Sequence, residues 1–371
     1  MVRRTEKKML SFILFFFLVH CALAADWAVI IVGSEGYWNY RHAAAASSAY
    51  QSFLKRGIPK QNIIMFMGSK DVYSENNPYQ GNLFFHPGPD SPNVFANMVI
   101  EYGSSEITSN RILNTLIGNS FSGKRVLRSS FFDTVYVAVF EYGAPGVITL
   151  PQDVIFGTDL QETIKTMFNK RMYKKLVFVI DGEKSDTLFW GMSLNDYNVK
   201  LVNPESLSIE NRNIFCPPKD VVRGKAIGSC MNTLFSYKYW GNDGFEIPQK
   251  ADRNVFQDNE VIGVMESGRN KKWSVYDSKL EHLFRIVTSD RKSAESRRAL
   301  LVEDNTRSQI EQYFLIMSRN RKVGKEVVSI TEWDCYKRGV KKLETLFLWD
   351  EYTFSFFGDI VNMCEQNKWS F

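Results

Sequence analysis

Apolar and polar positions alternate in blocks along the first two thirds of the chain. Near-continuous apolar runs, typical of strands covered on both faces, occupy residues 27–33, 62–67, 134–140 and 175–180. Helical spacing follows the first run at 43–57 and precedes the last from 158, where Thr158 and Gln161 fit a capping box. Strand, helix and strand in this order predict a parallel α/β sheet flanked by helices. In such sheets, sites lie beyond the carboxyl ends of the strands.

The strand pattern stops after about residue 250. Later segments, such as "YTFSFFGDIVNMCEQ", carry helical periodicity and predict a separate all-helical unit. A stretch rich in Gly, Asn and charge separates the two and is typical of a linker. We therefore expect an α/β domain at 25–245, a linker at 246–272 and a helical domain at 273–371.

The first 24 residues have the layout of a secretory signal peptide. Four basic residues precede the apolar run "MLSFILFFFLVHCALA", which closes on the small residues Ala22 and Ala24. The run is short for a transmembrane helix, so we expect cleavage after Ala24 and no stable membrane span afterwards. A signal anchor that is never cleaved is the alternative.

Removal of the signal changes the charge of the chain. The whole sequence carries +5, and the signal holds four basic residues and one acid, so the mature chain is near 5 − 3 = +2. A nucleic-acid binder would show a basic stripe with interleaved aromatic residues, so we expect no nucleic-acid partner. Local basic runs, such as 170–175 and 289–298, are typical of solvated helix faces.

Cysteine usage indicates an oxidising compartment. Cys21 leaves with the signal, and the four that remain are Cys216, Cys230, Cys335 and Cys364. Four cysteines allow three pairings, and composition does not choose among them.

Two strand ends offer candidate chemistry. The run 134–140 is followed by Glu141 and Tyr142, and the run 175–180 is followed by Asp181 and Glu183, with Ser185 just beyond. Nucleophilic catalysis needs a thiol, hydroxyl or amine beside a base, and no histidine stands at either strand end. The three carboxylates could form an acid–base pair, a cation site or a solvated cluster, and the lack of a further ligand pattern favours the solvated cluster.

Several stretches resemble the legumain family, the asparaginyl cysteine endopeptidases. The likeness is carried by "WAVIIVGSEGYWNYRHAAAASSAYQSFLKRGIPKQNII", "YSENNP", "SGKRVL" and "MYKKLVFVI", and it resumes in "DCYKRGVKKLE" and "VNMCEQ". It implies a caspase-like α/β fold, a mostly parallel sheet flanked by helices, followed by an all-helical C-terminal domain like the family's prodomain.

The resemblance also implies that both members of the catalytic dyad are replaced. Where the family has its catalytic His in Asp-His-Gly, this chain has Tyr142, and where the family has its nucleophilic Cys, it has Glu183. A carboxylate is a weak nucleophile towards an amide, and a phenol with a pKa near ~10 is a poor acid–base partner at acidic pH. We therefore expect no intact catalytic residue, and no metal or cofactor.

The family's substrate pocket is partly retained. Asn39, Arg41 and His42 match residues that orient the catalytic His or line the pocket, and Asp181 keeps its acid beside the nucleophile. Ser229 replaces the pocket's second acid, so a degenerate pocket is expected. The alternative is that residues 39–42 serve only packing at the first strand.

One disulfide follows from the same resemblance. Cys335 and Cys364 match a pair that the family bonds in its prodomain, whereas the partners of the family's second prodomain disulfide are missing. The pairing state of Cys216 and Cys230 stays open.

The resulting hypothesis is a catalytically inactive legumain-like protein with a peptide-binding or regulatory role. Its partner would be a peptide or protein ligand, such as an active legumain relative, in the secretory pathway, outside the cell or in the lysosomal or vacuolar lumen. The alternative is an active endopeptidase cleaving after Asn with a non-standard nucleophile, such as Cys216 or Ser185.

Overall fold

A computed structural model describes most of the α/β part of the chain and part of the C-terminal helices. The described residues are 25–120, 123–207, 209, 212–241, 309–310, 312–314, 329–347, 349 and 351–366. The predicted signal peptide at 1–24 and the predicted linker at 246–272 lie outside them. Among the residues described, no helix combines the length and apolar character needed to cross a membrane.

The centre of the molecule is a five-stranded parallel sheet in the order β2-β1-β3-β6-β7. The strands are β1 (Trp27–Val32), β2 (Ile63–Phe66), β3 (Thr134–Phe140), β6 (Lys175–Asp181) and β7 (Val199–Val202). Val32 pairs with Phe140, and Phe140 pairs with Asp181, so the three central strands end at the same level.

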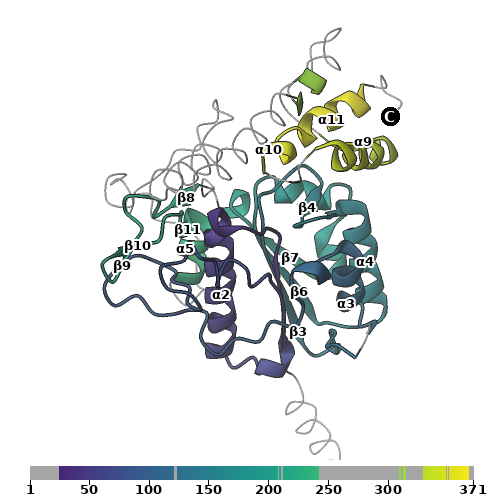
Figure 1. The fold of residues 1–371 in the computed structure, drawn as a ribbon. Coiled ribbons are helices and arrows are strands. Elements are labelled where there is room, and N and C mark those ends of the chain that lie inside the picture. Colours follow the sequence, from purple (N-terminus) through teal and green to yellow (C-terminus); the bar gives the residue numbers. More distant parts are fainter. Residues whose placement is uncertain are drawn as a thin grey trace, which may run out of the picture.

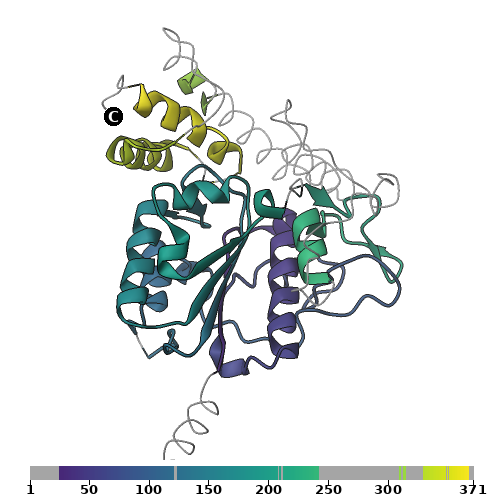
Figure 2. The same cartoon turned by 180° about the vertical axis from the view of Figure 1, so that it is seen from behind.

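Helices cover both faces of the sheet, which explains the continuous apolar strands (Figure 1, Figure 2). One face packs against α2 (Tyr40–Lys55) and α5 (Leu234–Gly241) and the other against α3 (Ser109–Leu116) and α4 (Gly157–Asn169). Along β1, Ala28 and Ile30 point to the face covered by α2 and α5. Val29 and Ile31 point to the face covered by α3 and α4.

Short elements connect the main helices and strands. Three antiparallel pairs are β4 (Val147–Thr149) with β5 (Val154–Phe156), β8 (Asn213–Ile214) with β11 (Asn232–Thr233), and β9 (Val221–Val222) with β10 (Lys225–Ala226). The described 3-10 turns are η1 (Tyr37–Asn39), η2 (Lys60–Asn62), η3 (Ser104–Glu106), η4 (Ser185–Phe189), η5 (Leu194–Tyr197) and η6 (Glu205–Leu207).

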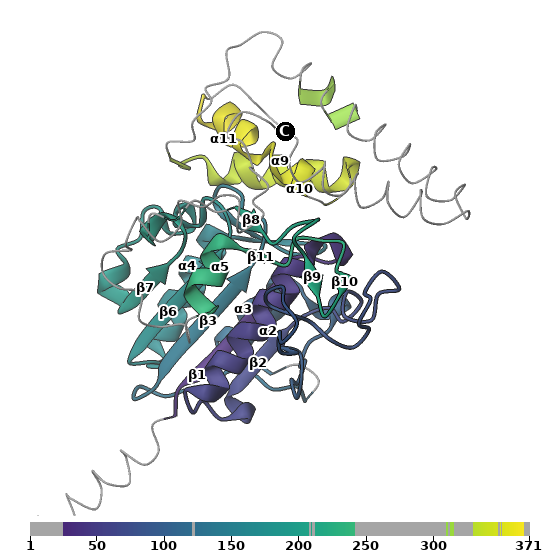
Figure 3. The ribbon, with the colours of Figure 1, turned by 90° about the vertical axis from the view of Figure 1, so that its left-hand side faces the viewer.

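The described C-terminal helices pack on the β4–β5 hairpin, over the carboxyl ends of the strands (Figure 3). They are α9 (Trp333–Leu346), α10 (Glu351–Phe354) and α11 (Phe357–Glu365), and the bond Cys335–Cys364 joins the first to the last. The Tyr336 hydroxyl donates to the Pro145 carbonyl at 2.5 Å. Lys337 pairs with Asp159 at 2.7 Å.

The predicted fold class is confirmed: a mostly parallel sheet flanked by helices, with helices at the C-terminus. The predicted capping box is wrong. Helix α4 begins at Gly157 without a side-chain cap, and the Gln161 amide instead donates to the carbonyls of Leu188 and Trp190. The Gln161 side chain therefore makes a tertiary contact instead of capping its own helix.

Candidate functional site at the carboxyl ends of the strands

The ends of β3 and β6 bring Tyr142 and Glu183 together. Glu141 N donates to the Asp181 carbonyl at 2.9 Å, and Glu183 N donates to the Tyr142 carbonyl at 3.3 Å, so the pairing continues past the strands. Gly143 makes this approach possible. Its φ is +86°, and a Cβ there would overlap the backbone of Glu183.

Tyr142 is the centre of an aromatic and polar contact set. The Asn39 Nδ2 donates to its hydroxyl. The His42 ring lies edge-on with its centroid 5.4 Å away, and the Arg41 guanidinium carbon lies 5.7 Å from the centroid of the phenol ring. On its other side, the centroid of the Phe354 ring in α10 is 5.7 Å away, so a C-terminal helix touches this position directly.

His42 is not available as an acid. It is 2% exposed, and its Nδ1 lies 2.7 Å from the Ser34 Oγ. Burial lowers its pKa well below the ordinary value, and the charge of Arg41 lowers it further. The imidazole is therefore held neutral and serves as packing against Tyr142.

Glu183 lies on an exposed turn, but the surrounding protein partly removes its carboxyl group from solvent. Surrounding protein raises the pKa of that carboxyl, the nearby Lys184 partly opposes this, and Glu205 adds to it. Lys184 takes a left-handed φ of 57°, and its N–H donates to Glu205 at 3.0 Å. The turn thus presents a carboxyl group at position 183, and the backbone of this residue is bonded to the Tyr142 carbonyl.

Ser185 is a poor alternative nucleophile. It is 1% exposed, and its Oγ accepts a hydrogen bond from Asn203 Nδ2 at 3.0 Å. A serine becomes nucleophilic when a base takes its proton, whereas this hydroxyl is bonded to an amide donor.

The prediction of a solvated carboxylate cluster is wrong for two of its three members. Glu141 is 2% exposed, and its Oε2 accepts from the Thr149 N–H at 2.5 Å and the Thr149 hydroxyl at 2.7 Å. Asp181 is 1% exposed, and its Oδ2 accepts from the hydroxyls of Thr233 and Ser236, each at 2.5 Å. These donors, which sequence reasoning missed, come from β4, β11 and α5, which are separate elements from the strands that carry the acids, so no local pattern reports them.

Burial changes the charge state of Glu141. Desolvation raises the pKa of Glu141 to about 8, against the effect of the Thr149 hydrogen bonds and with a small contribution from Asp181. Within the part of the chain that is described, no group of three His, Cys, Asp or Glu side chains could hold a metal ion. The cation-site interpretation therefore has no support from the geometry.

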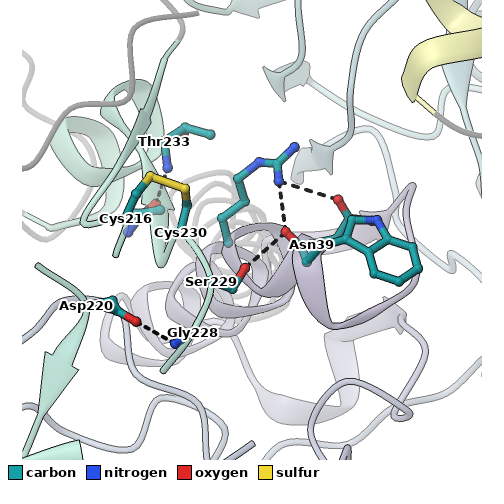
Figure 4. Close-up of a disulfide and its surroundings, with 10 residues drawn as sticks. Asn39, Cys216, Asp220, Gly228, Ser229, Cys230 and Thr233 are labelled. Carbon is teal, nitrogen blue, oxygen red and sulfur yellow. Dashed lines mark hydrogen bonds between the residues drawn. A yellow bond between two sulfur atoms is a disulfide. The ribbon is translucent and has the colours of Figure 1, made fainter. Parts of the chain in front are cut away.

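The five residues of the expected substrate pocket are all buried. Their exposed fractions are 1% for Asn39, 4% for Arg41, 2% for His42, 1% for Asp181 and 7% for Ser229. Three of them meet at the η1 turn: the carbonyl of Trp38 accepts from Arg41 Nη1 at 3.2 Å and from Ser229 Oγ at 3.1 Å (Figure 4). Arg41 Nη1 also reaches Asn39 Oδ1 at 3.4 Å. Internal partners therefore occupy groups that a ligand would need.

A disulfide holds Ser229 in this place. Cys216 and Cys230 are bonded to each other, which settles a pairing that the sequence left open (Figure 4). Asp220, between them, is fully buried, and its Oδ2 accepts from Gly228 N at 2.5 Å. The loop that carries Ser229 is therefore pinned by a covalent bond and by a buried carboxylate.

Comparisons with known proteins agree with this architecture. The model of the peptidase C13 family matches residues 26–254. The vacuolar-processing enzyme delta-isozyme of Arabidopsis thaliana is 28% identical over 223 residues, covering 59% of this chain and 47% of the relative. Human legumain is 32% identical over 189 residues, covering 49% and 43%.

A third relative, the hemoglobinase of Schistosoma japonicum, is 29% identical over 213 residues, covering 57% of this chain and 48% of the relative. The chain thus spans about half the length of these curated relatives. Since the family model covers more than half of the sequence and the sheet has the expected form, the chain belongs to the peptidase C13 (legumain) family.

Proposed function

We propose that this chain is a catalytically inactive legumain-type homologue with a regulatory, partner-binding role. The observation that carries the proposal is the pair Tyr142 and Glu183, side by side at the ends of β3 and β6, where the family resemblance places a His and a Cys. Asn39 still donates to the side chain at the first of these positions. The scaffold of the site is kept while its reacting groups are exchanged.

The exchange removes both chemical steps of peptide cleavage. A thiolate attacks a carbonyl carbon after an imidazole has taken its proton, and the imidazolium then protonates the leaving amine. Glu183 offers a carboxylate, which forms only an unstable anhydride with an acyl group. Tyr142 offers a phenol, whose ordinary pKa near ~10 keeps its proton in place at acidic pH. Loss of one member of such a unit already costs orders of magnitude in rate.

The buried pocket favours binding of a protein partner over capture of an Asn side chain. The polar groups of Arg41, Asn39 and Ser229 bond to each other or to the Trp38 carbonyl, and Phe354 lies against Tyr142. A peptide could enter only after these contacts were broken. An active legumain relative is the partner that we propose.

The two disulfides support a lumenal or extracellular location, because such bonds persist in oxidising compartments. We propose the secretory pathway, with the extracellular space or the lysosomal or vacuolar lumen as the destination.

The competing hypothesis is an endopeptidase with a non-standard nucleophile. Cys216, the cysteine candidate, is bonded to Cys230, so its sulfur is not a free thiol. Ser185 is buried and bonded to Asn203. Neither arrangement favours nucleophilic attack.

A double replacement tests the inactive site. The native protein and the Tyr142→His, Glu183→Cys variant are incubated at acidic pH with an Asn-containing peptide, and cleavage is followed by mass spectrometry. We expect no cleavage by the native protein. Cleavage by the variant would show that only the dyad is missing. If neither protein cleaves the peptide, the buried pocket has also lost its ability to bind substrate. Cleavage by the native protein would overturn the proposal.

Titration of an active legumain with the native protein tests the regulatory role. Binding that changes the rate of cleavage is the expected result. If no binding is detected at micromolar concentration and the rate is unchanged, the regulatory part of the proposal is wrong.

A further inference from the structure

The amino ends of the strands carry a surface that the site does not use. Two aromatic rings, Phe131 and Phe132, are 54% and 50% exposed just before β3, and they stand edge-on to each other. Three exposed basic residues, Arg128, Lys174 and Lys175, belong to the same region. We call these five residues the amino-edge patch.

Main-chain contacts hold the parts of this patch together. The Ser129 hydroxyl, next to Arg128, donates to the Met172 carbonyl at 2.5 Å. Lys174 N donates to the Asp133 carbonyl at 2.8 Å, and Lys175 pairs with Thr134 in the sheet register. The basic residues after α4 therefore lie beside the segment that carries the two rings.

The acids of the same region are already engaged. Asp133 is 4% exposed and accepts from Ala25 N at 3.0 Å and from Ser130 N at 2.7 Å. Asp26 accepts from Thr134 N at 2.9 Å. The three exposed basic residues outnumber these two acids, so the amino-edge patch has a positive net charge, and its apolar content is aromatic.

The start of the described chain lies in the same place. The bond from Ala25 to Asp133 fixes residue 25 at this edge, and the sequence before it is the basic and apolar stretch 1–24. If that stretch is removed after Ala24, the new amino group of Ala25 faces the Asp133 carboxylate. If it is kept as an anchor, the bilayer lies next to the patch. Only the second case places a bilayer at this edge through the chain itself, so in the first case binding would depend on the patch alone.

We propose that the amino-edge patch binds the surface of a bilayer that contains anionic lipids. Exposed aromatic rings enter the interfacial region of a bilayer, and basic side chains around them are attracted to anionic headgroups. This inference goes beyond the proposed function and does not depend on it. It also sets an orientation: the patch faces the lipid, and the ends of β3 and β6 with Tyr142 and Glu183 face away from it.

Vesicle binding of the full chain, purified as the cell processes it, tests the proposal. Co-sedimentation uses vesicles of phosphatidylcholine with and without phosphatidylserine, and mass spectrometry of the protein reports whether residues 1–24 remain. We expect binding to phosphatidylserine vesicles, weakened roughly tenfold or more by Phe131→Ser with Phe132→Ser. Lys174→Gln with Lys175→Gln should remove the preference for phosphatidylserine and the salt dependence. The matched control is Tyr73→Ser, which replaces an aromatic side chain that is 60% exposed, and it should bind as the native protein does.

A labelled variant keeps the test valid if stretch 1–24 remains or if the serine variants fold poorly. An environment-sensitive dye on Phe132→Cys should shift to shorter wavelength on phosphatidylserine vesicles, while the same dye on Tyr73→Cys should not. Absence of the shift, or equal vesicle binding by the serine variants and a native protein lacking 1–24, would overturn the proposal. A native dimer in sedimentation velocity that becomes monomeric in the serine variants, with no vesicle binding, would assign the patch to a second copy instead and likewise overturn it.

Discussion

The two ends of the sheet reverse the usual distribution of polar and apolar groups. At the carboxyl end, Glu141, Asp181 and His42 are nearly inaccessible to solvent, whereas at the amino end Phe131 and Phe132 are half exposed. Ordinarily, charged groups stay in water and large rings leave it. Burial of carboxylates costs free energy unless donors surround them, and here Thr149, Thr233 and Ser236 supply those donors.

The comparison teaches that each end is specialised in a different way. The carboxyl end is closed by internal hydrogen bonds and by a C-terminal helix, so it resembles a protein interior. The amino end is left open with groups suited to an interface. The following predictions test how stable the closure of the carboxyl end is and how much of it depends on single residues.

The largest effect is expected from Gly143→Ala. Its matched control is Gly57→Ala at the other end of the sheet, where φ is +85° but no atom lies within 4 Å of the added Cβ. At Gly143 the added Cβ would also meet the backbone of Glu183. We expect a loss of about 5 kcal/mol or more at Gly143 and about 1 kcal/mol at Gly57, measured by denaturant unfolding. Equal losses at both positions would show that the strand ends can separate freely.

The second effect is a pH dependence carried by Glu141. Its pKa is 4.5 in an exposed glutamate and about 8 in the folded protein, so the folded state holds a proton that the unfolded state releases. The resulting stabilisation is complete below about pH 4.5 and is lost as the pH rises towards about 8. His42, whose pKa is lowered, acts in the opposite direction as the pH falls through its ordinary range.

Glu141→Gln isolates this contribution. The free energy of unfolding of the native protein should fall relative to that of the variant by roughly 5 kcal/mol across the interval, because a shift of one pKa unit corresponds to about 1.4 kcal/mol. Unfolding curves at several pH values measure it. Parallel pH profiles for the two proteins would mean that Glu141 is ionised in the folded state.

The third effect concerns the C-terminal helices. Phe354→Ala removes a ring that contacts Tyr142, Trp349 and Phe357, and should cost roughly 3 kcal/mol. Limited proteolysis should then cut the C-terminal part faster. Leu346→Ala is the control, since this residue of α9 is 47% exposed and should leave the digestion unchanged. Unaltered digestion of the Phe354 variant would show that the closure does not depend on this contact.

The smallest effect is expected from Lys337→Ala. Its ammonium pairs with Asp159 at 2.7 Å, but both side chains are partly exposed, at 28% and 45%. Exposed ion pairs contribute little, so the loss should be about 0.5 kcal/mol and should vanish in high salt. A loss several times larger would place electrostatics alongside aromatic packing in holding the C-terminal helices.

Four of the five strands of the parallel sheet could be predicted from the sequence almost residue by residue, whereas the short edge strand β7 was missed. The expected runs 134–140 and 175–180 correspond to Thr134–Phe140 and Lys175–Asp181, because parallel strands buried on both faces need continuous apolar residues. The start of α4 could not be predicted, since Gln161 bonds to carbonyls about 30 residues later instead of to its own helix.

The proximity of Tyr142 and Glu183 could be predicted from the sequence, but their surroundings could not. The pattern of strand and turn identified Tyr142 and Glu183 at neighbouring strand ends, and the structure joins them by a backbone hydrogen bond. The burial of Glu141 and Asp181 was missed because their donors lie 8, 52 and 55 residues away along the chain. Periodicity reports neighbours within an element, whereas these contacts depend on how separate elements pack.

The bond between Cys335 and Cys364 has a consequence for any protease that reaches this protein. It joins residues 29 positions apart in the sequence and so encloses most of α9, all of α10 and most of α11. A single cut inside that loop leaves the two fragments covalently joined, so electrophoresis without reductant would show an undivided chain. Nicked and intact molecules would therefore have the same mass, apart from one water, until the disulfide is reduced and the two fragments separate.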